Sequence, residues 1–100
     1  MDINVKELKD KISNSEEFIL IDVREPYEHE EFNIEGELIP LGNFPGVIPE
    51  LEDRKDKEII VYCRSGRRSG MAQQMLQRAG FKTVRNLEGG VLAWLEEFGE

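Results

Sequence analysis

The chain has 100 residues, of which 39% are hydrophobic and 34% are charged, and its formal net charge is −8. This profile predicts one soluble globular domain over residues 1–100, without the run of roughly 20 apolar residues that a membrane-spanning helix needs. The acidity argues against nucleic-acid binding, and the single cysteine and single histidine exclude an internal disulfide and provide no zinc site. The N-terminus lacks the basic and apolar regions of a secretory signal, so we expect a cytoplasmic protein.

The first predicted element is a helix over residues 4–12. Its apolar residues recur at helical spacing and are expected to face the core: Val5, Leu8 and Ile12. Asn4 can cap this helix, and Glu7 completes a start that is similar to a capping box.

A buried strand is predicted over residues 18–23, where the apolar run FILIDV is followed by charge and then by Pro26. Residues 22–37 hold seven carboxylates, and we expect a solvated acidic surface there, with a patch for a basic partner as the alternative. His29 lies inside this stretch and is expected on the surface without a chemical role. Glycine and proline make residues 35–51 mostly loop, with a short strand at 38–39 and a short helix after Pro49.

The second half of the chain predicts a strand, a helix, a strand and a helix, over residues 58–63, 67–80, 82–87 and 90–98. The apolar face of the first of these helices comprises Ala72, Met75, Leu76 and Ala79, and Gly80 can end that helix. The last helix is expected to bury Val91, Leu92, Leu95 and Phe98, with Trp94 half-buried beside them. Met71 and Met75 are interpreted as core filling.

Buried strands that alternate with helices predict an α/β fold, in which a parallel sheet carries helices on both faces. Ligands of such sheets bind beyond the carboxyl ends of the strands. Cys63 stands at one such end and Asp22 at another.

The residues after Cys63 surround its sulfur with positive potential. A glycine turn followed by a helix presents backbone N–H groups and the positive helix end to an anion. The candidate binding loop comprises Arg64, Ser65, Gly66, Arg67, Arg68 and Ser69. Each feature favours the thiolate, the nucleophilic form of cysteine, and closely spaced arginines need anions or acidic side chains to compensate them.

The segment CRSGRRS, residues 63–69, resembles the active-site loop of the rhodanese family, sulfurtransferases that carry sulfur as a cysteine persulfide. DVREPYEHEEF, residues 22–32, resembles the first block of that family. NLEGGVLAWLE, residues 86–96, resembles its last block, with Gly89, Gly90, Ala93 and Trp94 in place. These three blocks stand in the right order and cover nearly the whole chain, which is a far more specific signal than any one of them.

The resemblance implies a parallel sheet of about five strands, with Cys63 as sulfur acceptor at the base of a shallow pocket. It implies that residues 64–68 cradle the transferred sulfur and the anionic head of the donor, and that Arg68 helps to bind that donor. Asp22 and Arg24 are expected to form a network that fixes the loops at the strand ends, with a direct catalytic role as the alternative. Where the family has Gly-His-Ile-Pro-Gly-Ala, this chain has FNIEGE, residues 32–37, which departs at Asn33 and Glu35; the departure bears on local conformation.

The expected activity is sulfur transfer without a cofactor or a metal, from thiosulfate, a polysulfide or a small persulfide to cyanide, a small thiol or a protein thiol. One alternative is a binding or sensing module with this fold and no turnover, although such relatives usually lack the cysteine. Another is a phosphatase or arsenate reductase. The phosphatase signature places arginine six positions after its cysteine, and Ser69 stands there instead.

Overall fold

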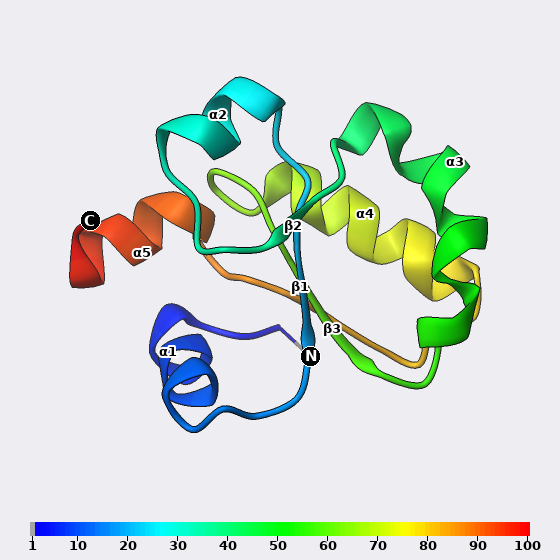
Figure 1. Ribbon diagram of the computed structural model, residues 1–100, viewed down its shortest axis with the longest axis horizontal. Coiled ribbons are helices and arrows are strands. Elements are labelled where there is room, and N and C mark those ends of the chain that lie inside the picture. Colours follow the sequence, from blue (N-terminus) through cyan, green and yellow to red (C-terminus); the bar gives the residue numbers. More distant parts are fainter. Residues whose placement is uncertain (1) are drawn as a thin grey trace.

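Four strands form one parallel sheet in the computed structural model, which describes residues 2–100 (Figure 1). They are β1 (Ile19–Asp22), β2 (Glu37–Leu38), β3 (Glu58–Tyr62) and β4 (Thr83–Asn86). Their spatial order is β2-β1-β3-β4, and every neighbouring pair is parallel. The α/β prediction is therefore confirmed, with four strands in place of about five. A single parallel bridge between Ile3 and Leu87 extends the pairing beyond β4.

One face of the sheet is covered by α4 (Arg67–Arg78) and by three short helical turns, η1 (Leu41–Asn43), α3 (Phe44–Val47) and η2 (Ile48–Arg54). Alternate residues of β3, Ile59 and Val61, are buried in the core on this side, together with Cys63. Side chains alternate between the two faces of a strand. Cys63 therefore faces the α4 side of the sheet.

The opposite face is covered by α1 (Val5–Ser13) and α5 (Gly90–Phe98), which lie beside each other in Figure 1. Ile60 and Tyr62 of β3 are buried in this second core. The predicted cap of α1 is confirmed, because the Asn4 side chain accepts a hydrogen bond from the Glu7 backbone at 2.8 Å. The two core layers explain why β1 and β3 read as continuous apolar runs.

The helix α2 (Pro26–Glu31) was not predicted, and neither were η1 and α3. Pro26 lies at the first position of α2, where its missing N–H is harmless, and Glu25 with Glu28 forms a capping box. The expectation of a mostly looped segment over residues 35–51 was therefore wrong. The short helix expected after Pro49 is confirmed by η2, in which Pro49 lies in the first turn, and Pro45 lies in the first turn of α3 in the same way.

Three predictions of burial were also wrong. Ile12, at the end of the predicted apolar face of α1, is exposed. On α5 the side chains of Leu92 and Phe98 are exposed, whereas Trp94 is buried. Met71 on α4 is exposed and does not fill the core. No helix within residues 2–100 is both long and apolar enough to cross a membrane.

Candidate functional site

Cys63 directly follows β3, and the backbone of its loop is held from outside. The N-terminus of α5 supplies two of these contacts: Val91 N–H donates to the Cys63 carbonyl at 2.9 Å, and Leu92 N–H donates to the Arg64 carbonyl at 3.0 Å. Gly66 has a φ of +104°, in the left-handed region that glycine tolerates. Because α5 binds the carbonyls of Cys63 and Arg64, the N–H groups of the loop can point toward the sulfur.

Cys63 is almost fully buried, and hydrogen-bond donors of the loop surround its sulfur. Gly66 N–H donates to Sγ at 3.1 Å, and the Ser69 hydroxyl lies 3.3 Å from Sγ. Burial raises the pKa of the Cys63 thiol, but hydrogen bonds from the loop outweigh burial and bring the pKa below its ordinary value. These bonds come from the Ser69 side chain and from the backbone of Ser69, Gly66 and Ser65. The arrangement favours a nucleophilic thiolate.

Asn86, the last residue of β4, was not identified from the sequence. Its Nδ2 donates to the Gly66 carbonyl at 2.9 Å, and the Ser69 hydroxyl donates to its Oδ1 at 2.6 Å. Its position at the carboxyl end of a predicted strand was the signal that could have found it, because β4 pairs with β3.

The three arginines of the loop have different surroundings. The Arg68 guanidinium forms two parallel hydrogen bonds with the Glu28 carboxylate of α2, at 2.8 and 2.9 Å. These bonds lower the pKa of Glu28 to about 2. Arg64 and Arg67 are exposed, and within the described part of the chain their side chains have no partner. Arg68 is thus compensated by an acidic side chain, whereas Arg64 and Arg67 are accessible to an anion from solvent.

A scan against family models matches residues 4–97 to the rhodanese-like domain. The chain belongs to the rhodanese-like domain family. It is 45% identical over 94 residues to YtwF of Bacillus subtilis (strain 168), whose name marks it as a proposed sulfurtransferase, with 93% of this chain and 88% of that protein covered. It is 34% identical to a sulfurtransferase of Allochromatium vinosum, with 93% and 86% covered.

Solved structures agree with this family. A rhodanese-related protein from Thermoplasma volcanium superposes with a TM-score of 0.83 at 30% identity, covering 99% of this chain and 94% of the other. The rhodanese-like domain is thus similar to sulfurtransferases over almost its full length.

Asp22 and Arg24 of the rhodanese-like domain form the expected network, but this network does not contact the sulfur. Asp22 pairs in register with Tyr62, on the face opposite Cys63. Arg24 donates to both oxygens of Asp22, through Nε at 2.9 Å and a terminal nitrogen at 2.7 Å. It also donates to the Phe32 carbonyl at 2.7 Å, which holds the end of α2. The contacts fit the positioning role predicted for this pair.

His29 takes part in the same network, so the expectation of a surface histidine was wrong. Its Nδ1 lies 2.8 Å from the second oxygen of Asp22. Burial raises the pKa of the Asp22 carboxyl, but hydrogen bonds from Arg24 and His29 outweigh burial and hold the pKa below its usual range. Because Asp22 is fully buried and Glu28 is paired, residues 22–37 are not simply a solvated acidic surface.

The segment that departs from the family pattern packs against Tyr62. The Tyr62 hydroxyl accepts hydrogen bonds from the backbone of Ile34 at 3.2 Å and of Gly36 at 3.3 Å. A Cβ on Gly36 would lie 2.7 Å from the Tyr62 ring, which explains why glycine stands there. Glu35 adopts a φ of +66°, and its N–H donates to the Asn33 side chain at 2.7 Å. The two departing residues thus form a local turn of their own.

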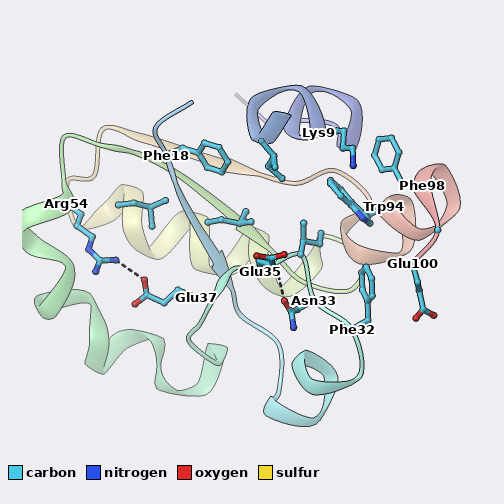
Figure 2. Close-up of a pocket in the computed structure, with 15 residues that line it drawn as sticks. Lys9, Phe18, Phe32, Asn33, Glu35, Glu37, Arg54, Trp94, Phe98 and Glu100 are labelled. Carbon is cyan, nitrogen blue, oxygen red and sulfur yellow. Dashed lines mark hydrogen bonds and ion pairs between the residues drawn. The ribbon is translucent and has the colours of Figure 1, made fainter. Parts of the chain in front are cut away.

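A hollow of about 830 Å³ lies away from the loop, beside α1, α5 and β1. No residue of the Cys63 loop lines it. Figure 2 shows Phe18 near its upper edge and Trp94 and Phe98 toward α5, with Lys9 directed at these two aromatic rings. Lys9 Nζ lies 5.6 Å from the Trp94 ring centre and 5.3 Å from that of Phe98. This hollow is separate from the thiol chemistry.

Proposed function

We propose that this rhodanese-like domain transfers sulfane sulfur and carries it as a persulfide on Cys63. The observation that carries the proposal is the buried sulfur that accepts the Gly66 N–H at 3.1 Å within a ring of loop donors. Such donors, fixed before the reaction, stabilise negative charge on sulfur without reorganisation. The relatives named sulfurtransferase support the same class of reaction.

In the first step the Cys63 thiolate attacks the outer sulfur of the donor, for example thiosulfate. A new S–S bond forms between Sγ and that sulfur. The bond between the two donor sulfurs breaks, and its electron pair leaves with sulfite. Total charge is conserved, because one thiolate becomes one persulfide anion while dianionic thiosulfate becomes dianionic sulfite.

In the second step an acceptor takes the outer sulfur from Cys63. A thiolate or cyanide attacks that sulfur, the S–S bond breaks, and its electron pair restores the Cys63 thiolate. The products are an acceptor persulfide or thiocyanate. After both steps the protein has returned to its starting oxidation state. The reaction therefore needs no oxidant or reductant besides the donor and the acceptor.

The loop residues have separate roles in this proposal. Backbone groups of Ser65, Gly66 and Ser69 stabilise charge on the cysteine sulfur. The exposed Arg64 and Arg67 meet the anionic head of the donor, and Arg68, in the first turn of α4, adds a charge-assisted hydrogen bond to it. The partners are a small sulfur donor and a thiol or protein acceptor, without nucleic acid or membrane.

The test is the intact mass of the protein after exposure to thiosulfate, a polysulfide or glutathione persulfide. We expect a gain of one sulfur atom with at least one donor, reversed by cyanide, and no gain in Cys63→Ser. If no donor labels the wild type, the chain is not a sulfurtransferase and a binding module becomes the better interpretation. Hydrolysis of an aryl phosphate, assayed in parallel, would instead support the phosphatase alternative.

A further inference from the structure

The Asn86 carboxamide contacts two of the residues that surround the Cys63 sulfur, Gly66 and Ser69. Asn86 projects from the sheet on the same face as Val84, two residues earlier, which is the face that α4 covers. It binds Gly66, whose N–H donates to Sγ, and Ser69, whose hydroxyl lies beside Sγ. Asn86 is therefore the residue through which β4 reaches the sulfur.

The hydrogen bonds of Asn86 decide where the Ser69 proton lies. The Gly66 carbonyl can only accept, so the atom 2.9 Å from it must be the amide nitrogen of Asn86. Asn86 Oδ1 then faces Ser69 and can only accept, which places the single hydroxyl hydrogen of Ser69 in the 2.6 Å bond to Asn86. In that state Ser69 presents a lone pair to the sulfur, 3.3 Å away.

This state suits a protonated thiol, whose S–H can donate to Ser69. An ionised sulfur has only lone pairs, so Ser69 stabilises the thiolate only after its hydrogen turns from Asn86 to Sγ. We propose that Asn86 is a positioning residue that competes with the Cys63 sulfur for the hydroxyl hydrogen of Ser69 and thereby limits how far Ser69 activates the thiol.

The charged groups around the sulfur stay the same when this competition is altered. They are Arg64 and Arg67 in the loop, Arg68 on α4 with its partner Glu28 on α2, and, on the other face, the Asp22 network. Substitutions at two neutral residues leave these charges in place. A change in the Cys63 pKa can then be traced to the hydroxyl hydrogen.

The test is a double-mutant cycle read as the pH profile of Cys63 alkylation by iodoacetamide. We expect Ser69→Ala to raise the Cys63 pKa about one unit further in the Asn86→Ala background than in the wild type, which is the size of one hydrogen bond to a charged group. The near-isosteric Asn86→Asp keeps a stronger acceptor for Ser69 and adds one negative charge. That charge is present both with and without Ser69→Ala, so the comparison within this background cancels it, and Ser69→Ala should raise the pKa less there than in the wild type. Equal rises in all backgrounds, or a larger rise with Asn86 present, would overturn the proposal.

A second measurement uses the unaltered chain and does not depend on whether the variants fold. The carboxamide carbon resonance of Asn86 should shift as Cys63 ionises, because Asn86 then loses a hydrogen bond that it accepts. A resonance that stays constant through the ionisation of Cys63 would contradict the competition. The inference rests on the proposed function only in taking the thiolate as nucleophile. Neither measurement needs a sulfur donor. They can therefore fail while persulfide labelling succeeds, and they can succeed while labelling fails.

Discussion

At the residue scale, the arginines beside Cys63 are explained by where their charges are compensated. Arg68 is held by Glu28 and does not hydrogen-bond the sulfur, whereas the Gly66 N–H donates to the sulfur and the Ser69 hydroxyl lies beside it. The hydrogen bonds that Arg68 donates to Glu28 raise the pKa of Arg68 above its ordinary value, and coulombic attraction to Cys63 adds to this rise. We therefore expect the Arg68 guanidinium to act mainly on an anionic donor bound near Cys63, and less on the Cys63 thiol.

Arg68→Ala is expected to weaken the use of thiosulfate more than it lowers intrinsic thiol reactivity. A charge-assisted hydrogen bond to a donor anion contributes about 1.5–3 kcal/mol, so kcat/KM for thiosulfate should fall roughly 10- to 100-fold. The measurement compares that value with the rate of alkylation of the same variant. Arg78→Ala, exposed in the last turn of the same helix, is the matched control and should change neither. Equal losses for Arg68→Ala would assign this residue to tuning of the thiol pKa.

The pairing of Glu28 predicts how stability depends on pH. Its folded pKa of about 2 lies below the ordinary value of 4.5, so the unfolded chain takes up the proton first as the pH falls. The stabilisation is complete above the unfolded pKa and disappears as the pH falls through the folded one. Glu28→Gln keeps the acceptor that caps α2 and should lower the free energy of unfolding by about 1–3 kcal/mol near neutral pH.

The difference between Glu28→Gln and the wild type should shrink between pH 4.5 and pH 2, the two values that bound this titration. Urea unfolding of both proteins across that range measures it, and the other carboxyl groups cancel because both proteins contain them. A difference that does not change with pH would mean that packing, and not charge, accounts for the loss.

At the scale of elements, the N-terminus of α5 braces the loop that follows Cys63. Gly90, the first residue of α5, has a φ of +57°, and a Cβ there would contact the Cys63 carbonyl and lie 2.6 Å from the Arg64 carbonyl oxygen. The same turn places the N–H groups of Val91 and Leu92 on these two carbonyls. The turn between β4 and α5 therefore lets α5 approach the loop backbone.

Gly90→Ala is expected to lower the free energy of unfolding by more than about 2 kcal/mol, because the backbone conformation and the contact are both unfavourable. The alkylation profile of Cys63 should also move to higher pH as the loop is displaced. Gly80→Ala is the matched control, since Gly80 has a φ of +93° but its Cβ would meet only the flexible Lys55 side chain, 3.5 Å away. That change should lower stability by about 1–2 kcal/mol and leave the profile unchanged. Equal effects at both glycines would contradict the bracing role.

At the scale of the whole molecule, the thiol and the main charge network lie at opposite ends of the sheet. Glu58 begins β3 and binds Lys11 at 2.9 Å and Arg85 at 3.0 Å, and Arg85 also binds Glu7 at 2.8 Å. Cys63 follows the other end of β3, about 16 Å away at the usual rise of a strand. This distance is about twice the screening length at physiological salt, so the two ends should act independently.

Glu58→Gln is therefore expected to lower the free energy of unfolding by about 2 kcal/mol while leaving the Cys63 pKa unchanged. Urea unfolding and the alkylation profile measure the two quantities on the same sample. Glu17→Gln is the control, because Glu17 is 89% exposed and its ion pair with Lys57, at 3.7 Å, should contribute almost nothing. A shift of the thiol pKa in Glu58→Gln would show that the two ends are coupled.

The sequence by itself determined the features that depend on neighbouring residues. The apolar runs predict β1 and β3, Asn4 predicts the start of α1, and the position of Cys63 after a buried strand predicts the candidate binding loop. These follow from hydrophobic periodicity and from local hydrogen-bond chemistry, which residues a few positions apart can express on their own.

The tertiary structure decided which distant residues meet. Glu28 reaches Arg68 across 40 positions, Asn86 reaches Ser69 across 17, and the half-buried His29 binds Asp22. α2 was missed because its six residues bury none of their side chains fully and therefore leave no apolar period to read. The sequence thus specified a cysteine at the end of a strand, and only the packing of α2, α4, α5 and β4 around that point decided which groups surround its sulfur.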